Sequence, residues 1–119
     1  MSKKTQKIKL ATHDFIYLVN IDSIIYCKSN NAYTTFFTSK EPQQITISSS
    51  LKQVQRLLGN TFLRTHQSYL VNTSFINGLS NGTTTGQQLT LTTGQKIPVS
   101  TRRKKEVLNY FASAMRIQA

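Results

Sequence analysis

The sequence has few acidic residues, a single cysteine and no long apolar run, and each shortage excludes a class of protein. Because Cys27 is the only cysteine, no internal disulfide can form, and a reducing, cytoplasmic environment is expected. The longest apolar run, at 15–19, is far too short to span a membrane. No apolar stretch follows Met1 that resembles a secretory signal.

No arrangement typical of an enzyme is present. The four Asp and Glu residues are scattered along the chain and share no local frame for acid–base catalysis. The sequence contains neither a glycine-rich phosphate loop nor a nucleophile-elbow motif. Cys27 has no neighbouring histidine or cysteine, which argues against a zinc site and favours a small buried side chain. We therefore predict no enzymatic activity, no cofactor and no metal.

Basic residues dominate what is there. Fifteen Lys and Arg against four acids give a formal charge of +11 on 119 residues. Such a field indicates polyanionic partners: nucleic acid first, then an anionic membrane or an acidic protein. One basic cluster lies at the N-terminus and the other at 102–105. We interpret 1–7 as a basic tail or linker and 8–116 as a single domain.

Short β-branched and aromatic runs separated by turn residues predict a mainly β, antiparallel fold. Ser50 and Gln53 have the spacing of a capping box, and apolar residues then recur at helical spacing up to Gly59. This predicts a short two-turn helix over 50–58. A second, C-terminal amphipathic helix is predicted over about 103–116. The residues predicted to face the core from it are Val107, Leu108, Phe111, Ala114 and Met115.

Three polar segments, at 28–33, 64–68 and 100–105, interrupt apolar runs where strand is expected to give way to loop. Arg can bind guanine and Asn or Gln can bind adenine at the major-groove edge, whereas Lys, Ser and Thr suit phosphates. Two structural alternatives stay open. The asparagines of the first segment could form a turn, and the second segment could be a hydrogen-bonded strand end.

Four consecutive cations at 102–105 stand where the second helix is expected to begin. A helix N-terminus carries partial positive charge, so each cation there is unfavourable by a few tenths to about 1 kcal/mol. An external phosphate would offset this effect and accept hydrogen bonds from the free N–H groups. The alternative is a helix that begins later, near Lys105, with solvated arginines.

Residues 62–72, Phe-Leu-Arg-Thr-His-Gln-Ser-Tyr-Leu-Val-Asn, closely resemble the central motif of the LytTR family of bacterial DNA-binding domains. Segments 25–34 and 94–100 resemble further landmarks of that family, in the expected order. The likeness covers about 8–115. It implies elongated antiparallel β-sheets with one short two-turn helix and a C-terminal helix. It also implies that loops enter successive major grooves of duplex DNA, usually at tandem direct repeats in promoters, and that a receiver domain often precedes the domain.

Carried over to this sequence, the base-reading positions of the family fall in the three polar segments. They are Asn31 or Tyr33 in the first, Gln67 in the second, and Arg102, with Arg103 as the alternative register, in the third. Gln67 stands where a basic residue is frequent in the family, which would favour adenine. The candidate phosphate contacts are Lys28, Asn30, Arg64, His66, Ser68, Lys104 and Lys105. Arg64 could equally be a structural hydrogen-bonder.

We predict a sequence-specific duplex DNA binder that regulates bacterial transcription, as the output domain of a two-component response regulator. It is expected to be a monomer in solution that pairs on DNA at tandem sites. The main alternative is a single-stranded nucleic acid (RNA) binding module, for which Tyr33 is the main exposed aromatic candidate. A third class is a protein-interaction or membrane-surface module. We expect no membrane partner, because the C-terminal helix lacks the aromatic-rich face of a membrane anchor.

Overall fold

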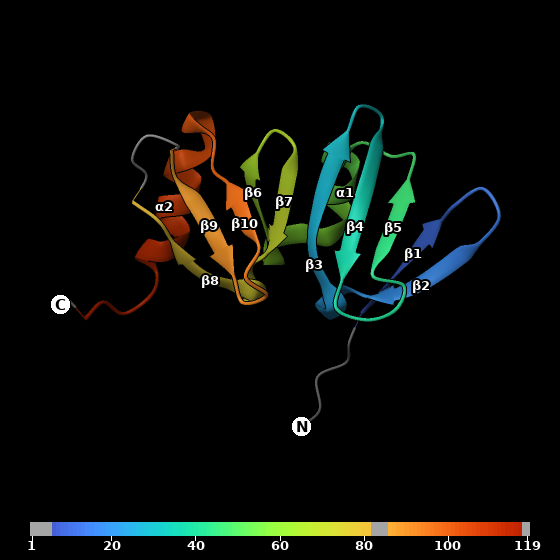
Figure 1. Cartoon of the computed structure of the whole chain (residues 1–119), viewed down its shortest axis with the longest axis horizontal. Coiled ribbons are helices and arrows are strands. Elements are labelled where there is room, and N and C mark those ends of the chain that lie inside the picture. The colour runs from blue at the N-terminus through green and yellow to red at the C-terminus, as the bar shows by residue number, and fades with distance from the viewer. Residues whose placement is uncertain (1–5, 82–85, 118–119) are drawn as a thin grey trace, which may run out of the picture.

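The computed structural model describes residues 6–81 and 86–117, and within these residues the chain is mainly β (Figure 1). The strands are β1 (Lys7–Ala11), β2 (Ile16–Asn20), β3 (Ile24–Asn30), β4 (Tyr33–Thr38), β5 (Gln44–Ile47), β6 (Phe62–His66), β7 (Tyr69–Asn72), β8 (Ile76–Leu79), β9 (Gln88–Leu91) and β10 (Lys96–Pro98). The helices are α1 (Leu51–Leu58) and α2 (Lys104–Ala112). The predicted fold class, antiparallel β with one two-turn helix and a C-terminal helix, is confirmed.

The strands pair into three antiparallel sheets that lie along the molecule. The central sheet has five strands in the order β5-β4-β3-β7-β6, and β10-β9-β8 and β1-β2 form the other two. Figure 1 shows the β1–β2 hairpin at one end and the three-stranded sheet with α2 at the other. The extents are 50 × 41 × 24 Å, so the molecule is elongated, as predicted.

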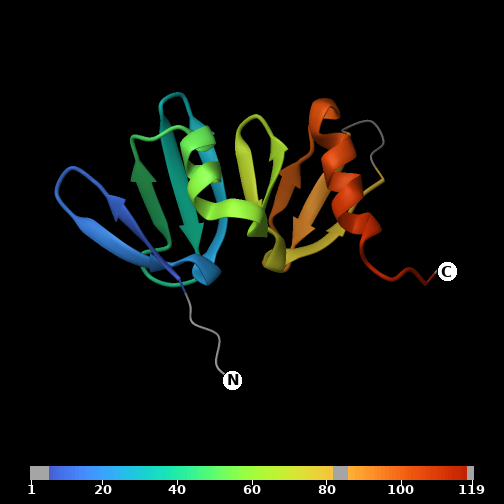
Figure 2. The same cartoon turned by 180° about the vertical axis from the view of Figure 1, so that it is seen from behind.

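The central sheet separates two hydrophobic cores. Successive residues of a strand face opposite sides, so Cys27 and Phe36 join one core while Tyr26 and Phe37 join the other. Figure 2 shows α1 covering one face of the sheet. The buried residues of the first core are Leu10, Ile24, Cys27, Phe36, Ile45, Leu51, Val54, Leu58, Phe62 and Leu70. Those of the second core, toward the three-stranded sheet and α2, are Tyr26, Val71, Leu89, Leu91, Ile97 and Val107.

Helix α1 begins and ends at the predicted signals. The Gln53 backbone N–H donates to Ser50 Oγ at 3.2 Å, and the Ser50 N–H donates to Gln53 Oε1 at 3.3 Å. These two bonds form the capping box and satisfy N–H groups that the first turn leaves free. Gly59 follows the helix with φ of 71°, a backbone conformation that glycine adopts without steric cost.

Helix α2 is shorter than the sequence predicts. A 3-10 turn at Thr101–Arg103 precedes it, and it ends at Ala112. Val107 is buried and Phe111 is half-buried, but Met115 is 98% exposed, so the prediction that the helix reaches 116 and packs Ala114 and Met115 on the core was wrong. Leu108, also predicted to face the core, is 44% exposed. Just after the helix, the Ser113 hydroxyl donates to the Tyr110 carbonyl at 2.8 Å, a local bond that competes with further helix.

The basic N-terminal tail lies mostly outside the described residues. Of the predicted tail 1–7, residues 1–5 are not described, and Lys7 is already the first residue of β1, paired with Asn20. The division into a tail and one domain stays a prediction. In the described part of the chain, no helix is both long and apolar enough to cross a membrane.

Candidate nucleic-acid interface

The three polar segments lie at one edge of the molecule, at the top in Figure 1. Strands β3, β6 and β10 run toward this edge, so the turn after each of them is brought there. The Ser29 N–H donates to the Ser68 carbonyl, and the Ser100 N–H donates to the Thr65 carbonyl, both at 2.9 Å. Segments 28–33, 64–68 and 100–105 are thus joined by backbone hydrogen bonds, and we call them together the loop edge.

The first segment is a tight turn between β3 and β4. Asn31 has a φ of 58°, the left-handed conformation that Asn tolerates better than most residues, so the turn interpretation holds for it. Asn30 pairs with Tyr33 as the last rung of the strand pair. The side chains of Asn30 and Asn31 are exposed, and Tyr33 is 54% exposed. The turn therefore presents two amides and one aromatic ring to solvent.

The second segment turns around His66. The Ser68 N–H donates to His66 Nδ1 at 3.0 Å, so the strand-end interpretation also holds. Because Nδ1 accepts this bond, the tautomer that fits it carries its N–H on Nε2. The His66 ring stands edge-on to Tyr69, and Lys28 Nζ lies 5.6 Å from the Tyr69 ring centroid. Gln67, at the tip, is exposed.

The guanidinium of Arg64 stabilises this turn with hydrogen bonds. Its Nε donates to the His66 carbonyl at 2.9 Å and its Nη2 donates to the Gln67 carbonyl at 2.6 Å. Its Nη1 donates to Gln55 Oε1 of α1 at 2.9 Å. Burial lowers the pKa of Arg64, and nearby Arg103 lowers it further, while Glu106 opposes both effects. These contacts favour the structural alternative for Arg64, and a phosphate contact from it stays a prediction.

An acid stands directly after the third segment, and its pairing was not predicted from the sequence. Glu106 lies in the first turn of α2, and its Oε1 is 3.0 Å from Arg103 Nη1. The helix begins at Lys104, so this carboxylate offsets part of the positive charge of 102–105 in its first turn. Ser100 Oγ accepts from the Arg103 N–H at 3.2 Å, so the turn begins at a serine cap. Arg102 is exposed, whereas Arg103 is half-buried and paired with Glu106. The two alternatives for the third base contact therefore differ in how accessible the side chain is.

The second and third segments share an open depression of about 280 Å³. The residues that line it are Arg64, His66, Gln67, Ser100, Arg102 and Arg103. The two candidate base readers Gln67 and Arg102 thus lie on one face. Lys104 and Lys105 are exposed on the next turn. Within 6–81 and 86–117, no three His, Cys, Asp or Glu side chains are grouped so as to hold a metal ion.

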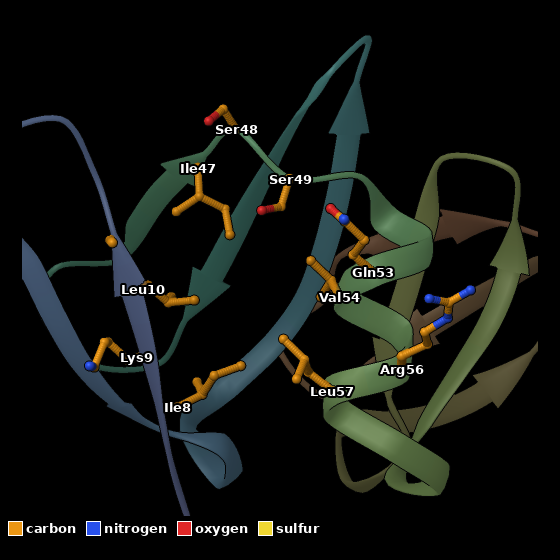
Figure 3. Close-up of a pocket in the computed structure, with 11 residues that line it drawn as sticks. Ile8, Lys9, Leu10, Ile47, Ser48, Ser49, Gln53, Val54, Arg56 and Leu57 are labelled. Atoms are coloured by element: carbon orange, nitrogen blue, oxygen red, sulfur yellow. The ribbon is translucent and has the colours of Figure 1, made fainter.

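A larger groove, of about 480 Å³, lies between β1, β5 and α1 (Figure 3). Its walls are mainly apolar, with Ile8, Leu10 and Val54 among them. Figure 3 shows Leu57 pointing toward β1 and Arg56 pointing to the other side of α1. The polar residues Lys9, Ser48, Ser49 and Gln53 also line the groove, but none of the three polar segments reaches it, and the loop edge remains the candidate interface.

Removing the charge of Glu106, which lies beside the loop edge, is expected to strengthen sequence-independent binding of DNA. Glu106→Gln frees Arg103 from its ion pair and raises the formal charge by one, so one more phosphate can be neutralised. The log–log salt slope on a duplex of random sequence should steepen by about 0.9. Losing a negative charge at the N-terminus of α2 should also lower the free energy of unfolding by about 0.3–1 kcal/mol. Salt-titrated anisotropy measures the first effect, and an unchanged slope would place Arg103 away from the DNA backbone.

Comparisons with known proteins bear on the family and the fold. The sequence pattern of the family described as the LytTr DNA-binding domain matches residues 14–112. Two relatives, each named sensory transduction protein LytT, are 28% identical, over 102 residues in Bacillus subtilis (strain 168) and 104 in Enterococcus faecalis (strain ATCC 700802 / V583). These matches cover 85% and 87% of this chain but 42% of each relative, so the chain spans less than half of their length. A solved LytTr DNA-binding domain from Bacillus cereus has the same fold, with a TM-score of 0.75 and 24% identity over 92% of this chain and 98% of that one.

Proposed function

The chain belongs to the LytTR family of DNA-binding domains, and from that premise we propose that it reads duplex DNA in a sequence-specific manner through its loop edge. One observation carries the proposal. Gln67 and Arg102, whose side chains suit base edges, line the same open depression, and backbone hydrogen bonds tie that depression to the turn at 28–33. Successive major grooves would receive the three segments, and binding at promoters would regulate transcription.

The base contacts follow from side-chain chemistry and exposure. Gln67 is exposed and has the donor–acceptor pair that matches adenine. Arg102 is exposed and has the fork that matches guanine, whereas Arg103 is held by Glu106. Arg102 is therefore the preferred register of the third contact. In the first segment, Asn31 or Tyr33 at the turn would supply the remaining contact.

Phosphate contacts would flank the base contacts along the same edge. His66 Nδ1 accepts from Ser68, which leaves Nε2–H as the ring donor that a phosphate could engage. Arg64 has two N–H groups left beyond its three hydrogen bonds and could add a weaker contact. The other proposed phosphate contacts are Lys28, Asn30, Ser68, Lys104 and Lys105.

We place this domain at the output of a two-component regulator, with a receiver N-terminal to it. The supporting observation is that the relatives are more than twice as long as the matched region and are named as sensory transduction proteins. A net charge of +11 opposes association of free copies, so a monomer that pairs only on DNA is expected. Tandem direct repeats would place successive copies in the same orientation.

In-vitro selection of bound duplexes from random DNA, followed by sequencing, tests the proposal. A short enriched word, repeated in the same orientation within longer selected fragments, is the expected result. Competition between the selected duplex and each of its single strands, in one anisotropy titration, tests the alternative of single-strand binding. A pool without any enriched word, or preferential release by the single strand, would reject sequence-specific duplex binding.

Two substitutions at the third segment should separate base from phosphate contact. Arg102→Ala is expected to weaken binding to the selected duplex by about 1–3 kcal/mol and to relax preference at one base pair. Lys104→Ala should weaken all sequences alike and reduce the salt slope by about one. Lys40→Ala, which removes one exposed cation between β4 and β5 at the opposite edge, is the charge-matched control. An unchanged sequence logo for Arg102→Ala would contradict the base assignment.

A further inference from the structure

We propose that Gln55 of α1 is a positioning residue for base recognition, which fixes the place of Gln67 through the guanidinium of Arg64. The inference rests on the proposed function, because it concerns how one base reader of that site is held. Gln55 does not belong to the three polar segments. Its influence on sequence preference would therefore be indirect.

The contacts form an unbroken path from the helix to the tip of the turn. Gln55 Oε1 accepts from Arg64 Nη1 at 2.9 Å, and Arg64 Nη2 donates to the Gln67 carbonyl at 2.6 Å. The third donor, Nε, holds the carbonyl of His66 at 2.9 Å. A guanidinium is planar and rigid, so fixing one corner fixes the direction of the other donors. The carbonyls of His66 and Gln67, which belong to the two peptide groups that flank the Gln67 Cα, are thus held from α1.

Arg64 requires such an acceptor. Its guanidinium is half-buried, and both its burial and the charge of Arg103 disfavour its charged form. The acid nearby, Glu106, is paired with Arg103. Among the hydrogen bonds of the described residues, Gln55 gives Arg64 its side-chain acceptor, and the other two acceptors are the carbonyls of the turn itself. Without Gln55, Arg64 would be bonded only to the carbonyls of the turn, so the guanidinium would move with the turn and could not fix its position.

The turn has little other support. A register shift interrupts the pairing of β6 with β7 between Arg64 and His66, so the regular ladder does not set the direction of Gln67. The remaining bonds of the segment run from Ser68 N–H to His66, from Ser29 N–H to the Ser68 carbonyl and from Ser100 N–H to the Thr65 carbonyl, and none of them engages Gln67. Recognition groups tolerate displacements of only about 0.5 Å. A small movement of the Gln67 backbone would therefore change which base its amide fits.

The experiment compares three variants at full chain length. Gln55→Met keeps the length of the side chain and removes the acceptor, Gln55→Glu keeps an acceptor oxygen, and Leu57→Gln alters an exposed site on the same helix that points toward β1. We expect Gln55→Met to reduce preference for the base pair read by Gln67 by about tenfold, with the other positions of the selected word unchanged. Gln55→Glu should restore the preference, and Leu57→Gln should leave it intact.

Free protein gives a readout that does not depend on DNA. In Gln55→Met, hydrogen exchange at the Arg64 guanidinium and at the backbone amides of residues 66–68 should accelerate by about fivefold. If wild type selects no word while this acceleration is seen, Gln55 still holds the turn at Gln67, but the proposed function fails. An unchanged logo, an equal loss at every base position, or no change in exchange would each overturn the positioning role.

Discussion

Raising monovalent salt from 50 to 200 mM is expected to weaken binding to the selected duplex by about 10³- to 10⁴-fold. The loop edge presents exposed lysines at 28, 104 and 105 and the exposed Arg102, and backbone donors and His66 add further contacts. We expect about five to eight phosphates to be neutralised, and each releases condensed counterions. The log–log slope should then lie near −5 to −7. Anisotropy titrations at several salt concentrations measure it.

The same titration on a duplex of unrelated sequence is the matched control. Sequence-independent binding is almost wholly electrostatic, so it should show a slope at least as steep while starting from a much lower affinity. Sucrose or another neutral solute in place of salt should produce little change. A slope shallower than about −3 on the selected duplex would mean that the loop edge does not follow the DNA backbone.

Sequence predicted the fold where the pattern is local. Short β-branched and aromatic runs indicated the antiparallel strands, and the spacing of Ser50 and Gln53 placed the start of α1. The end of α2 was not predictable in this way. Its apolar spacing continues to Met115, but that side chain is 98% exposed, and whether an apolar residue is covered depends on tertiary packing that spacing alone does not give.

The candidate site, too, was predictable from the sequence only in part. Resemblance and residue type directed attention to the three polar segments, and the fold brings them to one edge. Gln55 escaped notice, because its partner Arg64 lies nine positions away and only the packing of α1 brings them together. Glu106 was read as one of several scattered acids, although it stands three residues from Arg103 at helical spacing. That spacing was a signal that could have been used.

The other large effect is expected in the first core. Phe36→Ala should lower the free energy of unfolding by about 3–5 kcal/mol, because the ring is fully buried between the central sheet and α1 and its loss leaves a cavity. A domain of this size is stable by about 5–15 kcal/mol, so a large fraction of its stability would be lost. Urea unfolding followed by circular dichroism measures the change. The slope of unfolding free energy against urea should stay constant if both states keep their exposed surface.

The adjacent residue offers the matched control and a test of the two-core arrangement. Phe37 faces the second core, is only half-buried, and stacks on Tyr26 with ring centroids 4.4 Å apart. Phe37→Ala should therefore cost about 1–2 kcal/mol, well below the loss at Phe36. Because the two side chains lie on opposite faces of the central sheet, the losses should add in the double variant to within about 0.5 kcal/mol. Equal losses, or strong non-additivity, would contradict a sheet that separates two independent cores.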